Sequence, residues 1–217
     1  PPPQGISVIE SVKFIFTNED WKNNLLIASV FMFIPILGPI ATQGWHAEIF
    51  QRLVRGHPNP IPKLDFSDLM HYFGRGVASF VLSLIIMLPF FLVTYLGFAL
   101  SMFAGAAVAA AANEPVLMLV VWILLGLLYV LSMLTMMAVM HAAMIRAQLT
   151  ESVGEAVSPS KLIALMRKTW FKSLTNGLLF SLVAIPIVLL GYAACIFGLY
   201  PAIVVISCGT IFLRYQI

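Results

Sequence analysis

The chain has 217 residues, of which 61% are hydrophobic and 10% charged, and its net charge is +3. Because soluble domains carry about 25% charged residues and bury only part of their surface, this composition excludes an ordinary soluble protein and indicates one embedded in lipid. The basic residues are concentrated between the apolar runs and form no basic stripe interleaved with aromatic residues, which fits contact with anionic lipid headgroups better than with nucleic acid. We therefore expect no nucleic-acid partner.

The chain begins with Pro1-Pro2-Pro3-Gln4-Gly5, which lacks the basic segment, apolar core and cleavage site of a signal peptide. This segment is typical of a disordered, proline-bearing extension. The chain also stops directly after an apolar run, at residues 214–217, so we expect both ends to belong to a longer protein.

The first apolar run, residues 25–41, is interrupted by Pro35, Gly38 and Pro39. Proline removes a backbone donor and glycine permits a sharp bend, and each half is shorter than the roughly 20 residues that cross a bilayer. The run is therefore either one kinked span or a re-entrant hairpin that turns at these three residues. Basic loops tend to remain cytoplasmic, and Lys13 and Lys22 join the other basic segments there only if the run turns back. We therefore favour the hairpin.

Full spans are predicted in the rest of the chain. Residues 77–112 and 116–143 are each long enough to cross a bilayer, and Asn113-Glu114-Pro115 joins them in a tight helical hairpin. Residues 178–213 provide two more helices, with a break near Gly191-Tyr192 or Gly198. The expected fold class is all-α, a polytopic integral membrane protein with about four full spans plus the kinked or re-entrant hairpin.

A weak internal repeat divides this single membrane domain (1–217) into approximate units 5–56, 61–146 and 157–214. Each unit has a short amphipathic segment, an aromatic or basic residue, and then an apolar hairpin. Such segments, for example residues 158–168, are typical of helices that lie in the membrane interface. The predicted interfacial anchors are Trp21, Trp45, Arg52, Arg55, Lys161, Arg167, Lys168 and Trp170.

A methionine stripe follows one side of the helix predicted over residues 116–143. Met133, Met137, Met140 and His141 recur on that side at helical spacing, and thioether and imidazole ligands suit Cu(I). Methionine also fills irregular gaps between helices, and no second Met/His cluster faces this one. Packing is therefore the favoured interpretation, and we expect no bound metal and no cofactor.

Ionisable residues near membrane depth are candidates for function, and His46 and Glu48 end the first hairpin. Residues 43–55 continue as an amphipathic helix, in which Glu48 and Arg52 are four residues apart and suited to a surface ion pair. Interfacial anchoring is therefore favoured over a catalytic role.

Asp65, Asp68 and His71 form a further candidate cluster for a metal or a general base. The surrounding residues 63–68 are typical of a helix start, where Asp65 caps the helix and Asp68 lies in its first turn. The sequence supplies no further partner, so capping is favoured and no catalytic residue is predicted.

Residues 20–90 contain a series of short motifs: Phe33-Ile34-Pro35-Ile36-Leu37-Gly38-Pro39, Gly44-Trp45, Arg52-Leu53-Val54-Arg55-Gly56, Ile61-Pro62, Asp65-Phe66, Gly76 and Leu88-Pro89. Together they resemble an uncharacterised family of bacterial and archaeal integral membrane proteins, a domain of unknown function. The remainder of the chain resembles that family only in hydropathy. The resemblance implies a multi-pass protein of the bacterial cytoplasmic (inner) membrane and carries no activity with it.

Few polar groups lie inside the predicted spans, the external turns are short, and residues 104–112 form a small-residue tract that permits close helix packing. These features predict a non-enzymatic accessory or scaffold subunit, with other membrane subunits as partners. The alternative is a small transporter or lipid-handling protein that uses the helix break at Pro35–Pro39.

Overall fold

The computed structural model describes residues 6–112 and 115–217, and within these ranges the chain is helical and contains no strand. The predicted turn at Asn113 and Glu114 lies outside the described residues. In chain order the helices are α1 (Val8–Lys13), a 3-10 helix (Phe14–Thr17), α2 (Trp21–Met32), α3 (Leu37–Val54), a second 3-10 helix (Phe66–Asp68), α4 (Leu69–Ala112), α5 (Pro115–Thr150), α6 (Val153–Ala156), α7 (Pro159–Ala193) and α8 (Cys195–Gln216).

Four helices, α4, α5, α7 and α8, are long and apolar enough to cross a membrane, which confirms the predicted multi-pass, all-α fold. The break between α7 and α8 falls at Ala194, between the two predicted positions. The legs of this hairpin approach closely because Gly191 and Gly198 have no side chains. A Cβ at Gly191 would lie 2.9 Å from the Gly198 carbonyl oxygen.

The first apolar run forms two helices, α2 and α3, joined by a turn at residues 33–36. The Asn24 side chain of α2 and the Trp45 indole of α3 both donate to the Pro62 carbonyl oxygen, at 3.3 and 3.2 Å. The start of α2 and the middle of α3 therefore lie together, and the pair is a helical hairpin. Neither helix is among the four that are long and apolar enough to span.

The structure differs from the sequence prediction at residues 158–168. They do not form a separate interfacial helix, because α7 runs without interruption from Pro159 to Ala193. The physical reason is local: residues 160–185 contain no proline, and Pro186 lies inside the helix without ending it. The basic segment is thus the first part of a span that continues into the apolar region.

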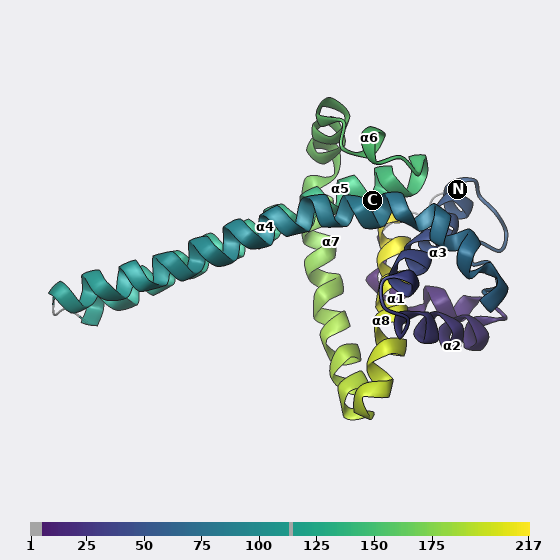
Figure 1. Ribbon diagram of the computed structural model, residues 1–217, viewed down its shortest axis with the longest axis horizontal. Helices are drawn as coiled ribbons and strands as arrows, with labels where there is room; N and C mark the ends of the chain where they lie inside the picture. The colour runs from purple at the N-terminus through teal and green to yellow at the C-terminus, as the bar shows by residue number, and fades with distance from the viewer. Residues whose placement is uncertain (1–5, 113–114) are drawn as a thin grey trace.

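The apolar core lies where α1, α2, α3 and α8 meet, and its largest fully buried side chains include Phe31, Trp45, Ile49 and Ile211. The two long hairpins extend from this core in different directions. Figure 1 shows the α4–α5 hairpin projecting well beyond the other helices, with the α7–α8 hairpin running steeply across it. The α4–α5 hairpin consequently exposes apolar side chains along most of its length.

The loop between α3 and α4 packs against the beginning of α2. The Asn18 amide donates to the Asn59 side chain and to the Ile61 carbonyl oxygen, both at 2.8 Å, and the Leu64 backbone N–H donates to Asn24 at 2.7 Å. Because prolines prevent this loop from forming regular structure, asparagine side chains satisfy its backbone polar groups instead.

A close backbone contact joins α3 to the start of α4. A Cβ at Gly44 would lie 1.8 Å from the Tyr72 carbonyl oxygen, and a Cβ at Gly76 would lie 1.8 Å from the Ile40 carbonyl oxygen. Only glycine permits this approach, because any side chain at either position would overlap the backbone of the other helix. The crossing therefore sets the direction in which α4 leaves the core.

Replacing Gly76 by alanine tests this crossing. Gly76→Ala is expected to lower the free energy of unfolding by about 1–3 kcal/mol, because the added methyl group forces the two backbones apart. Gly74→Ala is the matched control on the same helix, since no atom lies within 4 Å of its Cβ position, and it is expected to preserve or raise stability. Thermal unfolding of both variants in one detergent measures the difference. Equal transition temperatures would show that the crossing is not tightly packed.

Candidate functional site

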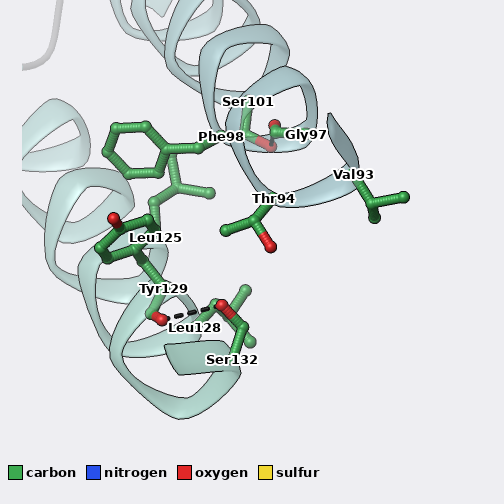
Figure 2. Close-up of a pocket in the computed structure, with 9 residues that line it drawn as sticks. All are labelled: Val93, Thr94, Gly97, Phe98, Ser101, Leu125, Leu128, Tyr129 and Ser132. Atoms are coloured by element: carbon green, nitrogen blue, oxygen red, sulfur yellow. Dashed lines mark hydrogen bonds between the residues drawn. The ribbon is translucent and has the colours of Figure 1, made fainter. Parts of the chain in front are cut away.

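The projecting hairpin carries a groove between α4 and α5 with a volume of about 220 Å³. Figure 2 shows that side chains from both helices line it. We call it the α4–α5 groove, and its lining comprises Val93, Thr94, Gly97, Phe98, Ser101, Leu125, Leu128, Tyr129 and Ser132.

The lining of the α4–α5 groove combines small and hydroxyl-bearing residues. No atom lies within 4 Å of the position that a Cβ would take at Gly97, which leaves a notch in the wall. The Ser101 hydroxyl donates to the Gly97 carbonyl oxygen at 2.6 Å, and the Ser132 hydroxyl donates to the Tyr129 carbonyl oxygen at 2.8 Å. These hydroxyl oxygens can still accept a hydrogen bond. Small residues and hydroxyl groups are the features that mediate contact between helices in membranes.

A second arrangement of polar residues joins the ends of α3, α4 and α5. The Arg75 guanidinium pairs with Glu48 at 2.6 Å and with Glu151 at 2.7 Å, and it also donates to the Gln51 side chain at 2.9 Å. Glu48 pairs in addition with Arg52. These five residues, which we call the Arg75 network, connect three helices through one cation, and Arg75 and Glu48 keep only 20% and 15% of their side-chain surface exposed.

The predicted pair between Glu48 and Arg52 is confirmed, and the Arg75 network extends it. Trp45 and His46 lie elsewhere. The Trp45 side chain is fully buried in the protein core, away from any headgroup layer, and His46 is buried with its Nε2 atom 3.2 Å from the Ser207 hydroxyl of α8. The sequence groups these neighbours into one cluster, but successive residues of a helix face different directions.

The other predicted anchors occupy the surface to different degrees. Trp21 is partly buried, packs edge-on against Phe16 at 5.2 Å and carries the Lys22 amine 5.5 Å above its ring. The exposed members of the set are Arg55, Lys161, Arg167, Lys168 and Trp170.

The methionine stripe lies between α5 and α7. Met137 packs against Gly177, and Met137, Met140 and His141 line one cavity, whose lining does not include Met133. The same cavity contains the Arg214 side chain. A guanidinium beside these ligands disfavours a metal cation, which supports the packing interpretation.

The structure confirms that Asp65 caps the short helix before α4. Its carboxylate accepts the Ser67 backbone N–H at 3.0 Å, and this hydrogen bond holds the pKa of the carboxyl below its usual range. His71 lies 3.9 Å from Glu48, at the edge of the Arg75 network, and no hydrogen bond or ion pair joins Asp65 or Asp68 to it in the described part of the chain.

Three residues of the Arg75 network, Gln51, Arg75 and Glu151, are absent from the residues predicted to form a site. Arg75 and Glu151 are 76 positions apart, so no helical periodicity connects them. A partial signal is present in the sequence: Arg75 directly precedes the glycine that contacts α3, and such a position places its side chain over the neighbouring helix.

Comparison with known proteins identifies a family that the chain matches. Residues 27–197 match the family model DUF4013, described as a protein of unknown function. The match confirms the resemblance found in the first part of the chain and extends it over most of its length. No curated protein matches the chain. No solved structure matches it either.

Removal of the central cation tests the Arg75 network. Arg75→Met leaves the Glu151 carboxylate without its cation, and we expect the free energy of unfolding to fall by about 1–3 kcal/mol. The exposed Arg55, which pairs with none of these carboxylates in the described structure, provides the control Arg55→Met. The transition temperatures of the two variants, measured at low and at high salt, are compared. Indistinguishable unfolding curves for Arg75→Met and Arg55→Met would contradict a structural role for Arg75.

Proposed function

The chain belongs to the DUF4013 family of proteins of unknown function, and we propose that it is a non-enzymatic, membrane-embedded accessory subunit of a larger membrane complex. The observation that carries this proposal is the α4–α5 groove. The occupant that fits it is a transmembrane helix of a partner subunit, because its walls offer a glycine notch and hydroxyl acceptors on an otherwise apolar surface.

The surroundings of the groove support the same occupant. The most apolar window of α5 has no buried residue, and α4 is buried along only 22% of its window, so most of the hairpin surface is available for contact. Leu127 and Leu128, for example, are 61% and 62% exposed. A hairpin that touches little of its own chain serves as an attachment element better than as part of an active site.

The alternative function, transport or lipid handling at the proline break, receives no support from the turn between α2 and α3. The exposed side chains there are Phe33, Pro35, Ile36 and Leu37, all of them apolar. A substrate site needs convergent polar groups, which these side chains do not supply.

The same turn supports insertion of the α2–α3 hairpin into one leaflet. Ile36 is 68% exposed and adopts φ = 67° and ψ = −58°, a γ-turn conformation that is rare for a β-branched residue. An exposed isoleucine is unfavourable in water but is accommodated in hydrocarbon. We therefore place this turn in the lipid as a re-entrant tip, with the basic segments facing the cytoplasm and anionic lipids of a bacterial cytoplasmic membrane.

Site-specific photo-crosslinking in intact membranes tests the docking role. A photoreactive residue at Leu128, in the groove, is expected to give one adduct of defined mass, whereas the same residue at Leu127, equally exposed but outside the groove, is not. Gly97→Leu fills the notch and is expected to reduce that adduct at least about tenfold, the effect of losing roughly 1.4 kcal/mol of binding.

Gly126→Leu is the matched control, since Gly126 also has open space at its Cβ position but does not line the groove. It should leave the adduct unchanged. A protein that purifies as a solitary monomer in mild detergent, and crosslinks equally from both leucine positions, would contradict the proposed function.

Cysteine labelling of whole cells tests the orientation. Single cysteines at Ser7, Ser67 and Ser158, in a background without Cys195 and Cys208, are all expected to label only after permeabilisation. The Ser7 backbone N–H donates to Gln216 at 2.8 Å, so the start of α1 and the end of α8 share one side. Labelling of Ser7 from outside would instead require the α2–α3 segment to cross the membrane.

A further inference from the structure

Arg214, in the last turn of α8, has no counter-ion among the residues that the structure describes. Its Nη1 atom donates weakly to the Gln148 side chain at 3.4 Å, and its Nε atom is fully buried without a hydrogen-bond partner. Every ion pair in the described part of the chain involves other cations. An unpaired guanidinium that is largely removed from water is costly, and the cost disappears when an anion binds to it.

A cavity of about 280 Å³ adjoins this guanidinium, between α3 and α8. Its polar lining consists of Gln43 and His46 from α3 and of Ser207, Thr210 and Arg214 from α8. No carboxylate lines it. The Ser207 and Thr210 hydroxyls donate to the Val204 and Ile206 carbonyl oxygens at 2.9 and 2.8 Å, and rotation about their C–O bonds lets them donate to a ligand instead. One cation among neutral polar side chains repels metal cations and favours an anion.

A second cavity, of about 260 Å³, lies on the other side of Arg214, between α5, α7 and α8. Its walls are mainly apolar and include Met137, Phe180 and Leu213, while Thr210 and Arg214 belong to both cavities. The first cavity is also lined by apolar side chains, among them Met144 and Ile203, and the second is the more apolar of the two. Two cavities with mainly apolar walls that share one arginine match an amphiphile, whose anionic group pairs with the guanidinium while its chain lies along the apolar walls.

Buried polar atoms around Arg214 lack partners in addition to its own Nε. They are Gln43 Oε1, His141 Nε2 and Gln148 Nε2. Each of these side chains either lines one of the two cavities or touches Arg214 itself. Two of these atoms, Arg214 Nε and Gln148 Nε2, carry donor hydrogens, and because buried donors are nearly always hydrogen-bonded in native proteins they indicate a missing acceptor.

We propose that Arg214, with Gln43, Ser207 and Thr210, binds a phosphate anion, and that the apolar cavity receives the acyl chain of the phospholipid that carries it. The guanidinium forms two parallel hydrogen bonds to phosphate oxygens. Arg214 and Gln148 both lie in the last turns of their helices, α8 and α5, at the end of the molecule that also carries the Arg75 network. That is the depth at which lipid phosphates lie. The site is independent of the α4–α5 groove and of partner binding there.

Lipid titration of the delipidated full chain in neutral detergent tests the proposal, with bound lipid counted by native mass spectrometry and thermal stability measured in parallel. Phosphatidylglycerol is expected to bind and to raise the transition temperature, whereas diacylglycerol, which has the chains without the phosphate, is not. Inorganic phosphate added alone distinguishes a free phosphate ligand from a phospholipid. If it raises the transition temperature as much as phosphatidylglycerol does, the ligand is the free anion and the lipid proposal is overturned. A much weaker effect supports the phospholipid.

Arg214→Gln is expected to weaken phosphatidylglycerol binding at least tenfold without lowering the stability of the lipid-free protein, because it removes an unpaired cation. Arg55→Gln, at an exposed arginine, is the control and should bind as the original chain does. If Arg214→Gln does not fold, Thr210→Val provides the test instead. Valine keeps the side-chain volume between the two cavities but removes the hydroxyl, and the affinity for phosphatidylglycerol is expected to fall several-fold. Binding that is unchanged in the Arg214→Gln or Thr210→Val variant, or equal for diacylglycerol, would overturn the proposal.

Discussion

The contact between the backbones of α3 and α4, at Gly44 and Gly76, is the constraint on which the other features depend. It brings the two helices to van der Waals distance, and it places Arg75, the residue before Gly76, over Glu48, one turn beyond Gly44. The same guanidinium then holds Glu151 at the end of α5. A single close crossing thus holds both legs of the projecting hairpin at their base, where α6 and α7 also contact the hairpin.

The features of the fold that could be predicted from the sequence are those determined by residues close together along the chain. Hydropathy identifies α4, α5, α7 and α8 because a spanning helix is defined by its own composition. The Asp65 cap and the Glu48–Arg52 pair are likewise local, since their partners lie within one helical turn. Of the predicted turn residues, Pro35 lies in the turn between α2 and α3, whereas Gly38 and Pro39 lie in the first turn of α3, where proline is tolerated.

The remaining contacts join residues far apart in the sequence, and helical periodicity contains no information about them. His46 meets Ser207 of α8, 161 positions away, and Arg214 meets Gln148, 66 positions away. In the sequence Arg214 is one more basic residue after an apolar run, typical of a cytoplasmic anchor. Its burial between α3, α5 and α8 is a property of packing. The surfaces that now carry functional proposals are therefore those that composition and periodicity could not reveal.

The two long hairpins contain helices that are longer than the hydrocarbon core of a bilayer is thick. At about 1.5 Å per residue, the 44 residues of α4 extend to about 66 Å and the 35 residues of α7 to about 52 Å, whereas the hydrocarbon core of a bilayer measures about 30 Å. Helices this long either tilt within the bilayer or extend beyond its hydrocarbon core. Figure 1 shows the two hairpins running in different directions from their common base. Hairpins that diverge from a common base leave a wedge of membrane between them, which lipid or another helix must fill. The α4–α5 groove offers small residues and hydroxyl acceptors. A hairpin surrounded only by acyl chains needs neither of these features, so a helix matches that space better than lipid does.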